Sequence, residues 1–502
     1  PSRPSRKRSI PQTASRPAKK PKTQAHHQTQ DDNTSNSYLR IYCLGNNDNG
    51  ELGLGAQHGI DDVKVPTLNP YLSYPSSPPP PPSSNSRRRK KAPATIKAKV
   101  TQLAAGGMHC AVLTSANDIL TWGVNDNGAL GRDTSSAARL EELIQNLTLQ
   151  EEDDRREREE LDLNLLEACP GPEKIPKWKQ IVACDSATFV LSTAGQVYGW
   201  GCTRSSQGIS IWSSNPPVEI QRTPARISFG SDKITKLAAR GNHVLALTGN
   251  GQVYTWGAGC EQGQLGRRLP KRGKAMLECA VTPRKIGLRG VVDVAAGPDH
   301  SFAVGGKGKE VWGWGLDNYA QTGVVRDDRG EEGGLFVEEP RRVRGLEGVL
   351  NGRRIKVLTG GNSHSLCLLE DGSLWSWGRI DNCATGVDLE EQLGDGMWEK
   401  EWIVKDERGR ARIVLCPVKI LPRDEGDVGI RWVEGGAEHG VAVTEEGKVI
   451  TWGFNASHQT GHKGEEVKVP KMIAMKGELE GVEFSWAGAG GHFTILGEEV
   501  GL

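Results

Sequence analysis

The chain has 502 residues, of which 36% are hydrophobic and 25% are charged, with a formal net charge of only +1. This length accommodates a large core and one to three ordinary domains, and the balanced charge excludes a global basic field of the kind that attracts nucleic acid. Glycine is frequent at 63 residues and tryptophan at 14. Abundant glycine without low complexity indicates many tight turns, and therefore many short strands.

Cysteine usage and the lack of a targeting signal indicate an intracellular protein. The ten cysteines are scattered without a CxxC pair, which argues against a zinc site. No secretory signal or long apolar segment is visible, so we expect a reducing compartment and no membrane contact. The chain begins at Pro1 rather than at a methionine, and we expect a few residues to precede it.

Residues 1–37 have no apolar periodicity, and we predict that they form a disordered basic tail. Two basic clusters separated by ten residues lie within it, namely Lys7 and Arg8, then Lys19, Lys20 and Lys22. This spacing is typical of a bipartite nuclear import signal, which would engage a nuclear import receptor. The alternative is a merely solvated tail, and the same charges also suit DNA phosphates, which they would bind without reading sequence.

Two short sequence patterns repeat along the rest of the chain. The first is an apolar strand that ends in aromatic-Gly or Leu-Gly, in seven copies: Leu44-Gly45, Trp122-Gly123, Trp200-Gly201, Trp256-Gly257, Trp314-Gly315, Trp377-Gly378 and Trp452-Gly453. The second is a small-residue turn before an alternating strand, in seven copies that include Met108-His109, Asp185-Ser186, Asn242-His243, Asp299-His300, Ser363-His364, Glu438-His439 and Gly491-His492. Asn250-Gly251 and Asp371-Gly372 are hairpin signals that join the two patterns.

Each repeat therefore indicates a small antiparallel sheet, and a series of such sheets closes into a ring that leaves only short, protected edges. The chain starts on one pattern and ends on the other, so strands from both termini would complete one blade. We predict an all-β fold, a seven-bladed β-propeller over residues 38–497, with residues 498–502 as the C-terminal end. The repeated tryptophans fit the blade core. The repeated histidines fit turns or, alternatively, a ligand-facing role.

Three segments interrupt or extend the blades. Residues 70–93 form a proline-rich loop insertion with a basic end in the first blade. Residues 136–177 form a second loop insertion, and its part Arg139–Glu167 is strongly acidic and compatible with a helix. A basic loop, Arg267–Lys274, follows the turn of the fourth blade. We assign no partner to the two insertions.

No catalytic constellation is visible in the sequence. The chain has no GxxxxGK[ST] loop and no HExxH motif, and Gly305–Lys309 is interpreted as a hairpin turn rather than a phosphate cradle. We therefore expect no cofactor, no metal, no catalytic residue and no enzymatic activity.

The Ala-Gly-Gly-x-His and Trp-Gly-x-Asn-Asp-x-Gly-x-Leu-Gly units resemble those of the regulator of chromosome condensation family over residues 38–497. Two runs, Gly128–Ser135 and Glu261–Arg267, are similar to the founding exchange factor of that family and its fungal counterparts. The resemblance implies a monomeric, nuclear, chromatin-associated guanine-nucleotide exchange factor for a Ran-type small GTPase, which supports nucleocytoplasmic transport and mitosis. Such a protein promotes GDP release and GTP loading without covalent chemistry.

The resemblance also implies functional residues. In the family a hairpin wedge of the third blade enters the nucleotide site of the GTPase, and the matching residues here are Thr203, Arg204, Ser205, Ser206 and Gln207. One face of the ring supplies further GTPase contacts, which map to Asp48, His109, Asp185, Asn242, Arg267, Ser363 and His364. A loop of the fourth blade engages the acidic patch of the nucleosome, which maps to Arg268, Lys271, Arg272 and Lys274. The alternative for this loop is a solvated hairpin tip.

Three positions depart from the family pattern. Thr203 replaces an aromatic residue, Asn242 replaces an aspartate, and Ser363-His364 replaces a histidine pair. An aspartate at position 242 would add a charge-assisted contact, so the resemblance predicts that Asn242→Asp tightens GTPase binding and raises its salt sensitivity. Alternatively, Asn242 only satisfies its own turn, and the substitution leaves the affinity unchanged.

Other classes of function remain open at this point. A chromatin-bound propeller scaffold without exchange activity would keep the tail and the basic loop, while the residues of the wedge face would have been replaced. A light sensor is another class, because plant ultraviolet-B photoreceptors share this ring, but their Gly-Trp-Arg-His-Thr repeats do not occur in the sequence. An enzyme built on a propeller scaffold comes last.

Overall fold

The computed structural model describes residues 38–54, 62–72, 99–132, 134, 167–168, 176–214, 216–271, 273–324, 335–343, 345–387, 402–420 and 428–501. The basic tail, most of the proline-rich insertion and most of the acidic insertion lie outside these residues. Within them nearly all regular structure is β-strand, because alternating apolar residues separated by Gly-containing turns favour short antiparallel strands.

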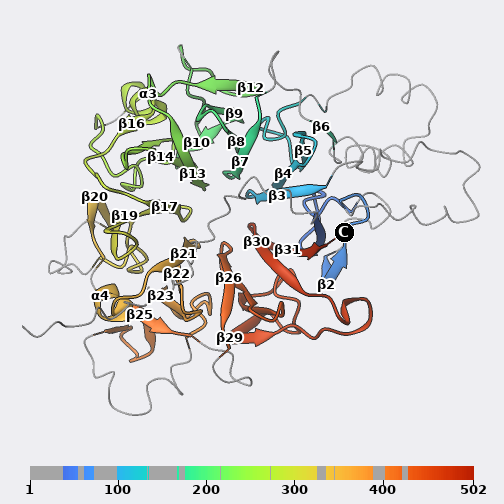
Figure 1. Cartoon of the computed structure of the whole chain (residues 1–502). Coiled ribbons are helices and arrows are strands. Elements are labelled where there is room, and N and C mark those ends of the chain that lie inside the picture. Colours follow the sequence, from blue (N-terminus) through green and yellow to red (C-terminus); the bar gives the residue numbers. More distant parts are fainter. Residues whose placement is uncertain are drawn as a thin grey trace, which may run out of the picture. The chain divides into compact units, whose positions relative to one another are not determined.

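The strands form seven antiparallel units, and Figure 1 shows the first strand of each unit toward the centre of a ring. Blade 1 comprises β30 (Phe484–Ala489), β31 (Phe493–Val500), β1 (Tyr38–Gly45) and β2 (Val63–Leu68). Blade 2 comprises β3 (Val100–Ala105), β4 (His109–Thr114), β5 (Ile119–Gly123) and β6 (Glu167–Ala168). Blade 3 comprises β7 (Trp178–Ala183), β8 (Ala187–Ser192), β9 (Val197–Gly201) and β12 (Gln221–Ile227). Blade 4 comprises β13 (Ile234–Arg240), β14 (His243–Thr248), β15 (Val253–Trp256) and β16 (Arg284–Lys285).

Blades 5 to 7 follow the same plan. Blade 5 comprises β17 (Asp293–Ala296), β18 (His300–Gly305), β19 (Glu310–Leu316) and β20 (Phe336–Arg342). Blade 6 comprises β21 (Ile355–Gly360), β22 (His364–Leu369), β23 (Leu374–Arg379) and β25 (Ala411–Lys419), with β24 (Ile403–Lys405) added at its edge. Blade 7 comprises β26 (Ile430–Gly435), β27 (His439–Thr444), β28 (Val449–Phe454) and β29 (Glu466–Met472). The remaining elements are β10 (Thr203–Arg204), β11 (Ser210–Ile211), α3 (Lys274–Val281), α4 (Leu346–Leu350) and the 3-10 helix η1 (Gly477–Leu479).

Blade 1 is assembled from both ends of the described chain. Strand β31 pairs antiparallel with β1 without interruption, from Tyr38 opposite Val500 to Gly45 opposite Phe493. Blades 1 and 2 also meet through one residue pair, which joins their strands into one continuous sheet. The predicted all-β propeller, closed by strands from both termini, is confirmed.

The repeated tryptophans form the blade core and also join neighbouring blades. Six of them are fully buried: Trp122, Trp200, Trp256, Trp314, Trp377 and Trp452. The indole N–H of Trp200, for example, donates to the Ala129 carbonyl of blade 2 at 2.8 Å. At Gly53, where φ is +64°, a Cβ atom would lie 2.7 Å from the Trp122 indole nitrogen. The repeat therefore needs glycine at this position, because the tryptophan of the next blade packs directly on the backbone.

The repeated histidines also join blades. The Nε2 atoms of four of them lie 2.8–3.0 Å from a Ser or Thr hydroxyl of the next blade: His109, His243, His300 and His439. Burial lowers the pKa of each imidazole, to about 4 for His109 and about 3 for His300. His364 occupies the same repeat position, but the next blade carries Gly440 where the hydroxyl would be. Among the described residues neither ring nitrogen of His364 has a protein hydrogen-bond partner.

Arg240 at the end of β13 links four blades through the middle of the ring. Its guanidinium donates to the Glu434 carboxylate of blade 7 and to the Ala489 carbonyl of blade 1, both at 3.1 Å. Thr359 of blade 6 donates to the same carboxylate at 2.6 Å. Burial raises the pKa of Glu434, and Arg240 partly offsets that increase. This axial contact, defined by Arg240, Glu434, Thr359 and Ala489, ties blade 4 to the opposite side of the ring.

Candidate functional site

The loop after β9 in blade 3 forms a hairpin, β10–β11, at the ring face where the first and third strands of every blade end. These ends share one face because the first and third strands of an antiparallel sheet run in the same direction. Ser205 closes the tip of the hairpin. Its amide donates to the Ile209 carbonyl at 3.0 Å, and its hydroxyl accepts a hydrogen bond from the Ile209 amide at 3.2 Å. The residues of the sequence-predicted wedge therefore belong to one compact element.

The five wedge residues differ in exposure. Thr203 and Ser205 are buried. The Thr203 hydroxyl accepts a hydrogen bond from the backbone amide of Ala258 in blade 4 at 3.0 Å, so this side chain anchors the base of the hairpin. The other three wedge residues are exposed: Arg204, Ser206 and Gln207. A partner that approaches this face can contact these three.

Blade 4 contacts the backbone of the hairpin at two further points. Asn242, in the turn between β13 and β14, accepts a hydrogen bond through its Oδ1 from the Arg204 amide at 2.7 Å. Glu261, in the turn after β15, accepts one from the Ser206 amide at 3.1 Å. Both acceptors are half-buried. The predicted GTPase contact at Asn242 is thus joined directly to the predicted wedge.

Two carboxylates lie in the corresponding turns of the neighbouring blades. Asp185 in blade 3 is exposed and Asp299 in blade 5 is half-buried. Partial desolvation by the surrounding turns raises the pKa of both carboxyls, and the charge of Asp185 raises the pKa of Asp299 further. Arg240 partly offsets the increase at Asp185. Since Asp185 remains open to solvent, its carboxylate is accessible to a cationic group on a partner.

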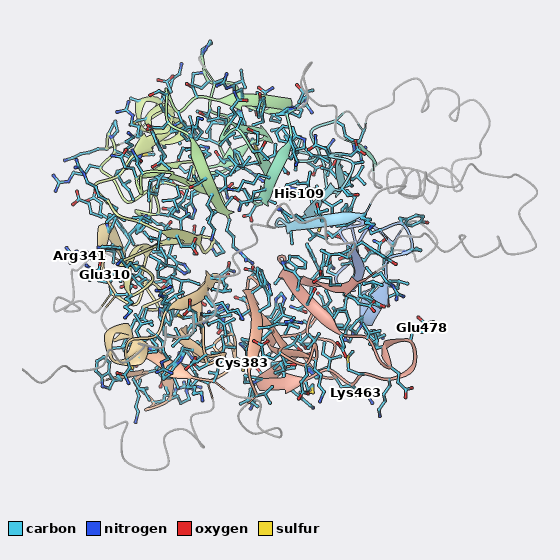
Figure 2. All side chains as sticks on the ribbon, viewed as in Figure 1. His109, Glu310, Arg341, Cys383, Lys463 and Glu478 are labelled. Atoms are coloured by element: carbon cyan, nitrogen blue, oxygen red, sulfur yellow. The ribbon has the colours of Figure 1, made fainter. Side chains whose placement is uncertain are left out.

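The other predicted contacts in the turns differ in accessibility. Asp48 is exposed, and Asn46 donates to its carboxylate at 2.8 Å. His109, His364 and Ser363 are each no more than 5% exposed. Figure 2 places His109 toward the middle of the ring. Side chains this deeply buried lie beneath the surface that a partner would contact, and the exposed Met108 beside His109 is the accessible residue of its turn.

Arg267 holds helix α3 against blade 4. Its guanidinium donates to the carbonyls of Cys279 at 3.1 Å and Ala280 at 3.0 Å, which lie in the last turn of the helix. A cation is favourable there because the helix dipole places partial negative charge at the C-terminus. Burial lowers the pKa of Arg267. The guanidinium is therefore engaged inside the blade, where it joins β15 to the C-terminal end of α3.

The basic loop predicted to contact the nucleosome is exposed where it is described. Arg268, Lys271 and Lys274 are all open to solvent, and Arg272 lies outside the described residues. Arg268 forms an ion pair with Glu339 at 3.2 Å, and Lys274 forms one with Glu278 at 3.6 Å. Such exposed pairs contribute little free energy, so both cations can exchange partners easily. The predicted import residues in the basic tail also lie outside the described part of the chain.

Three residues of this face were not identified from the sequence. Ile209 at the hairpin tip is 47% exposed. It could have been identified from the sequence as an apolar residue in an otherwise polar turn. Arg240 occupies a repeat position where the other blades carry Gly or Cys. A comparison of the seven repeats would have singled it out as the one charged residue at that position. Glu261 begins one of the two runs that resemble the family, but only the fold shows that it lies beside the hairpin.

The described residues contain neither a metal-binding cluster nor a membrane-spanning helix. No group of three or more His, Cys, Asp or Glu side chains among them is placed to hold a metal ion. In the same part of the chain no helix has the length and apolar character that crossing a membrane requires. What the face provides is a rigid hairpin, accessible carboxylates and a basic loop, which are groups suited to binding a macromolecule.

Fold and site together define a seven-bladed β-propeller that carries a hairpin with exposed side chains on one face. Residues 40–496 match the family model described as the RCC1-like domain. The chain belongs to the RCC1 family.

Individual relatives agree with this assignment. The chain is 34% identical to Protein pim1 of Schizosaccharomyces pombe, over 91% of this chain and 74% of that protein. It is 32% identical to the guanine nucleotide exchange factor SRM1 of Saccharomyces cerevisiae, over 91% of this chain and 87% of that protein.

Two solved structures are similar over nearly the whole chain. The crystal structure of Prp20p from Saccharomyces cerevisiae, described together with its binding to Gsp1p and histones, is 29% identical with a TM-score of 0.74 and covers 93% of this chain and 92% of its own. The structure of yeast RCC1 (Prp20) bound to Kap60 is 30% identical with a TM-score of 0.75 and covers 98% of this chain and 97% of its own.

Proposed function

We propose that this protein is a guanine-nucleotide exchange factor for a Ran-type small GTPase. The observation that carries the proposal is the preformed β10–β11 hairpin of blade 3, whose Arg204, Ser206 and Gln207 are exposed. A relative named as an exchange factor supports it, since SRM1 is similar over 87% of its length. The proposed action releases GDP and permits GTP loading without a covalent step.

Exchange requires that the protein binds the nucleotide-free GTPase more tightly than the GDP-bound form. A rigid element that occupies the phosphate site of the GTPase provides that difference, because nucleotide and hairpin then compete for the same place. Arg204 supplies a cation where phosphate was bound, and Ile209 supplies an apolar contact at the hairpin tip. Asp185 and Asp48 offer exposed carboxylates to basic residues on the surface of the GTPase.

The direct test measures release of labelled GDP from a purified Ran-type GTPase with and without this protein. We expect strong acceleration by the wild type. We expect the rate to return to that of the GTPase alone when Arg204–Gln207 is replaced by a Gly-Ser turn of equal length. Circular dichroism and thermal unfolding would establish that the ring of this variant is intact. If the variant releases GDP as fast as the wild type, the wedge assignment is wrong.

We also propose that the protein acts on chromatin in the nucleus. The exposed cations Arg268, Lys271 and Lys274 suit the acidic patch of the nucleosome, and the binding of Prp20p to histones is a property of a similar protein. The basic tail would add salt-sensitive contact with DNA phosphates. A chromatin-bound scaffold without exchange activity is the alternative, and the GDP-release assay separates the two.

Two experiments test the chromatin and import proposals separately. Gel-shift titration should show weaker binding to nucleosomes whose acidic patch is neutralised, and equal affinity for both kinds would eliminate the loop contact. Fluorescence imaging should show reduced nuclear accumulation when Lys19, Lys20 and Lys22 are changed to alanine. The tail variant must be compared in a protein that keeps the basic loop and in one that lacks it, because binding to chromatin also retains a protein in the nucleus.

A further inference from the structure

The β10–β11 hairpin is too small to be rigid by itself. Each of its strands has two residues, and one ladder with a five-residue connection buries little apolar surface. Isolated two-stranded hairpins are at best marginally stable in water. An element of this size can enter a partner in one fixed geometry only if other parts of the molecule hold it.

Blade 4 supplies that support through the hairpin backbone. The amides of Arg204 and Ser206 donate to the side-chain oxygens of Asn242 and Glu261, at 2.7 Å and 3.1 Å. Because the donors are backbone amides, these two bonds fix the path of the chain and leave the side chains of Arg204 and Ser206 free for a partner. The bond to Glu261 is charge-assisted and therefore stronger than a neutral one.

The two acceptors themselves are held in place by tight packing within blade 4. The Gly259 amide donates to the Asn242 carbonyl at 3.1 Å, which joins the turn of Asn242 to the turn that carries Glu261. A Cβ atom at Gly259 would lie 3.0 Å from the Asn242 Cβ, so the two turns are in close contact. The hairpin of blade 3 is thus fastened to a rigid surface of the next blade.

We propose that Asn242 and Glu261 are positioning residues, which hold the backbone of the β10–β11 hairpin in the conformation that enters the GTPase. This inference rests on the proposed exchange function and adds to it. Both side chains act through the amides of the hairpin rather than on the GTPase or its nucleotide. Holding the hairpin before the encounter lowers the cost of ordering it on binding, which favours the nucleotide-free complex.

The first arm of the test uses the full-length protein without any GTPase. Hydrogen exchange of backbone amides is measured for the wild type, Asn242→Ala and Glu261→Ala. We expect the Arg204 amide to exchange about tenfold faster in Asn242→Ala, and the Ser206 amide about tenfold faster in Glu261→Ala, as the loss of one such hydrogen bond implies. The amides of β8 and β14 should keep their wild-type protection. Unchanged hydrogen exchange at both hairpin amides would show that Asn242 and Glu261 do not hold the hairpin backbone, and would overturn the proposal.

The second arm measures GDP release from the Ran-type GTPase as a function of exchange-factor concentration. We expect the maximal rate to fall about tenfold in each alanine variant, while Glu261→Gln, which keeps an acceptor oxygen, stays within about twofold of the wild type. Asn242→Asp also keeps its acceptor and should show wild-type rates and wild-type salt dependence. Glu219→Ala is the matched control, because it removes an exposed carboxylate from blade 3 without touching the hairpin amides.

The outcomes distinguish the positioning role from the exchange function itself. Labile hairpin amides together with an undiminished release rate would overturn positioning while the exchange function stands. A Glu261→Gln variant as slow as Glu261→Ala, or an Asn242→Asp variant with raised salt sensitivity, would show a direct charge contact with the GTPase and overturn it too. No acceleration of GDP release by the wild type would overturn the exchange function and with it this role. The hydrogen-exchange measurement would still show whether Asn242 and Glu261 hold the hairpin backbone.

Discussion

The turns after the third strands of blades 2 and 3 begin at the same repeat position and use it differently. In blade 2 the position is Asn125, whose Oδ1 accepts from the Leu130 amide at 2.9 Å and whose Nδ2 donates to the Arg132 carbonyl at 3.0 Å. That turn closes on itself. In blade 3 the position is Thr203, whose hydroxyl accepts from the Ala258 amide of the next blade. The loop of blade 3 is thereby fastened to its neighbour.

The difference separates a structural use of the repeat from a functional one. The closed turn of blade 2 presents the Ala129 carbonyl inward, where it accepts hydrogen bonds from Trp200 and Thr188 of blade 3. The hairpin of blade 3 instead presents the side chains of Arg204, Ser206 and Gln207 outward. The turn of blade 2 therefore joins neighbouring blades, whereas the hairpin of blade 3 is held by the neighbouring blade. Substitutions in the first should change stability, and substitutions in the second should change only local order and exchange.

The largest expected effect comes from removing the core side chain that the closed turn receives. Trp200 is fully buried, and Trp200→Ala removes both its packing and its hydrogen bond to Ala129. We expect a loss of about 4 kcal/mol in the free energy of unfolding, measured by urea denaturation. Trp402→Ala is the control, because that side chain is 38% exposed. A loss at Trp200 no larger than the control would show that the blades are not joined in this way.

The axial contact should have the next largest effect. Arg240→Ala leaves the half-buried Glu434 carboxylate without its cation, and we expect a loss of about 3 kcal/mol in the free energy of unfolding. The exposed Arg226 on β12 is the matched control and should cost less than about 0.5 kcal/mol. Urea denaturation of both variants checks the expectation. Equal stability of the two would mean that Arg240 does not tie the blades.

The turn position itself gives the sharpest comparison. Asn125→Ala loses three hydrogen bonds of the closed turn, with Leu130, Arg132 and Thr134, and we expect a loss of roughly 2 kcal/mol in the free energy of unfolding. Thr203→Val loosens the base of the hairpin, which can open by itself, so we expect faster amide exchange at Ala258 without a change in global stability. The contrast fails if Thr203→Val destabilises the whole ring as much as Asn125→Ala does.

The smallest effect concerns the buried histidines and pH. Their lowered pKa values mean that the folded ring binds fewer protons than the unfolded chain below about pH 6.5. Stability is therefore fully present above that pH and falls as the pH drops toward about 3 for His364. At pH 5.5 each such histidine costs about 1 kcal/mol relative to pH 7.5.

His364 allows this contribution to be isolated, because its ring has no protein partner to lose among the described residues. We expect His364→Leu to reduce the stability difference between pH 7.5 and pH 5.5 by about 1 kcal/mol. His300→Leu should reduce the difference similarly but lower stability at both pH values, since it breaks the contact with Ser365. An unchanged pH dependence in His364→Leu would show that this imidazole is not neutral in the folded ring.

Much of the fold and part of the site could be predicted from local sequence patterns. The seven Trp-Gly and turn patterns predicted the number of blades, because each pattern reports a strand end and a tight turn within a few residues. The resemblance to the family, rather than these local patterns, placed the wedge at Thr203–Gln207. Neither the patterns nor the resemblance could tell that His109 and His364 are buried or that Arg267 is engaged with α3, because a repeated polar residue gives the same pattern whether it faces solvent or the next blade.

The sequence by itself determined the repeating strands, the glycine-dependent turns and the joining of both termini in one blade, since alternation and turn chemistry act over short stretches of chain. Only the tertiary structure decided which atoms meet between blades. Arg240 and Glu434 are 194 positions apart, and Glu261 lies 55 positions beyond Ser206. Their contacts depend on the closing of the ring, which brings distant turns within hydrogen-bonding distance, and no local pattern encodes that distance.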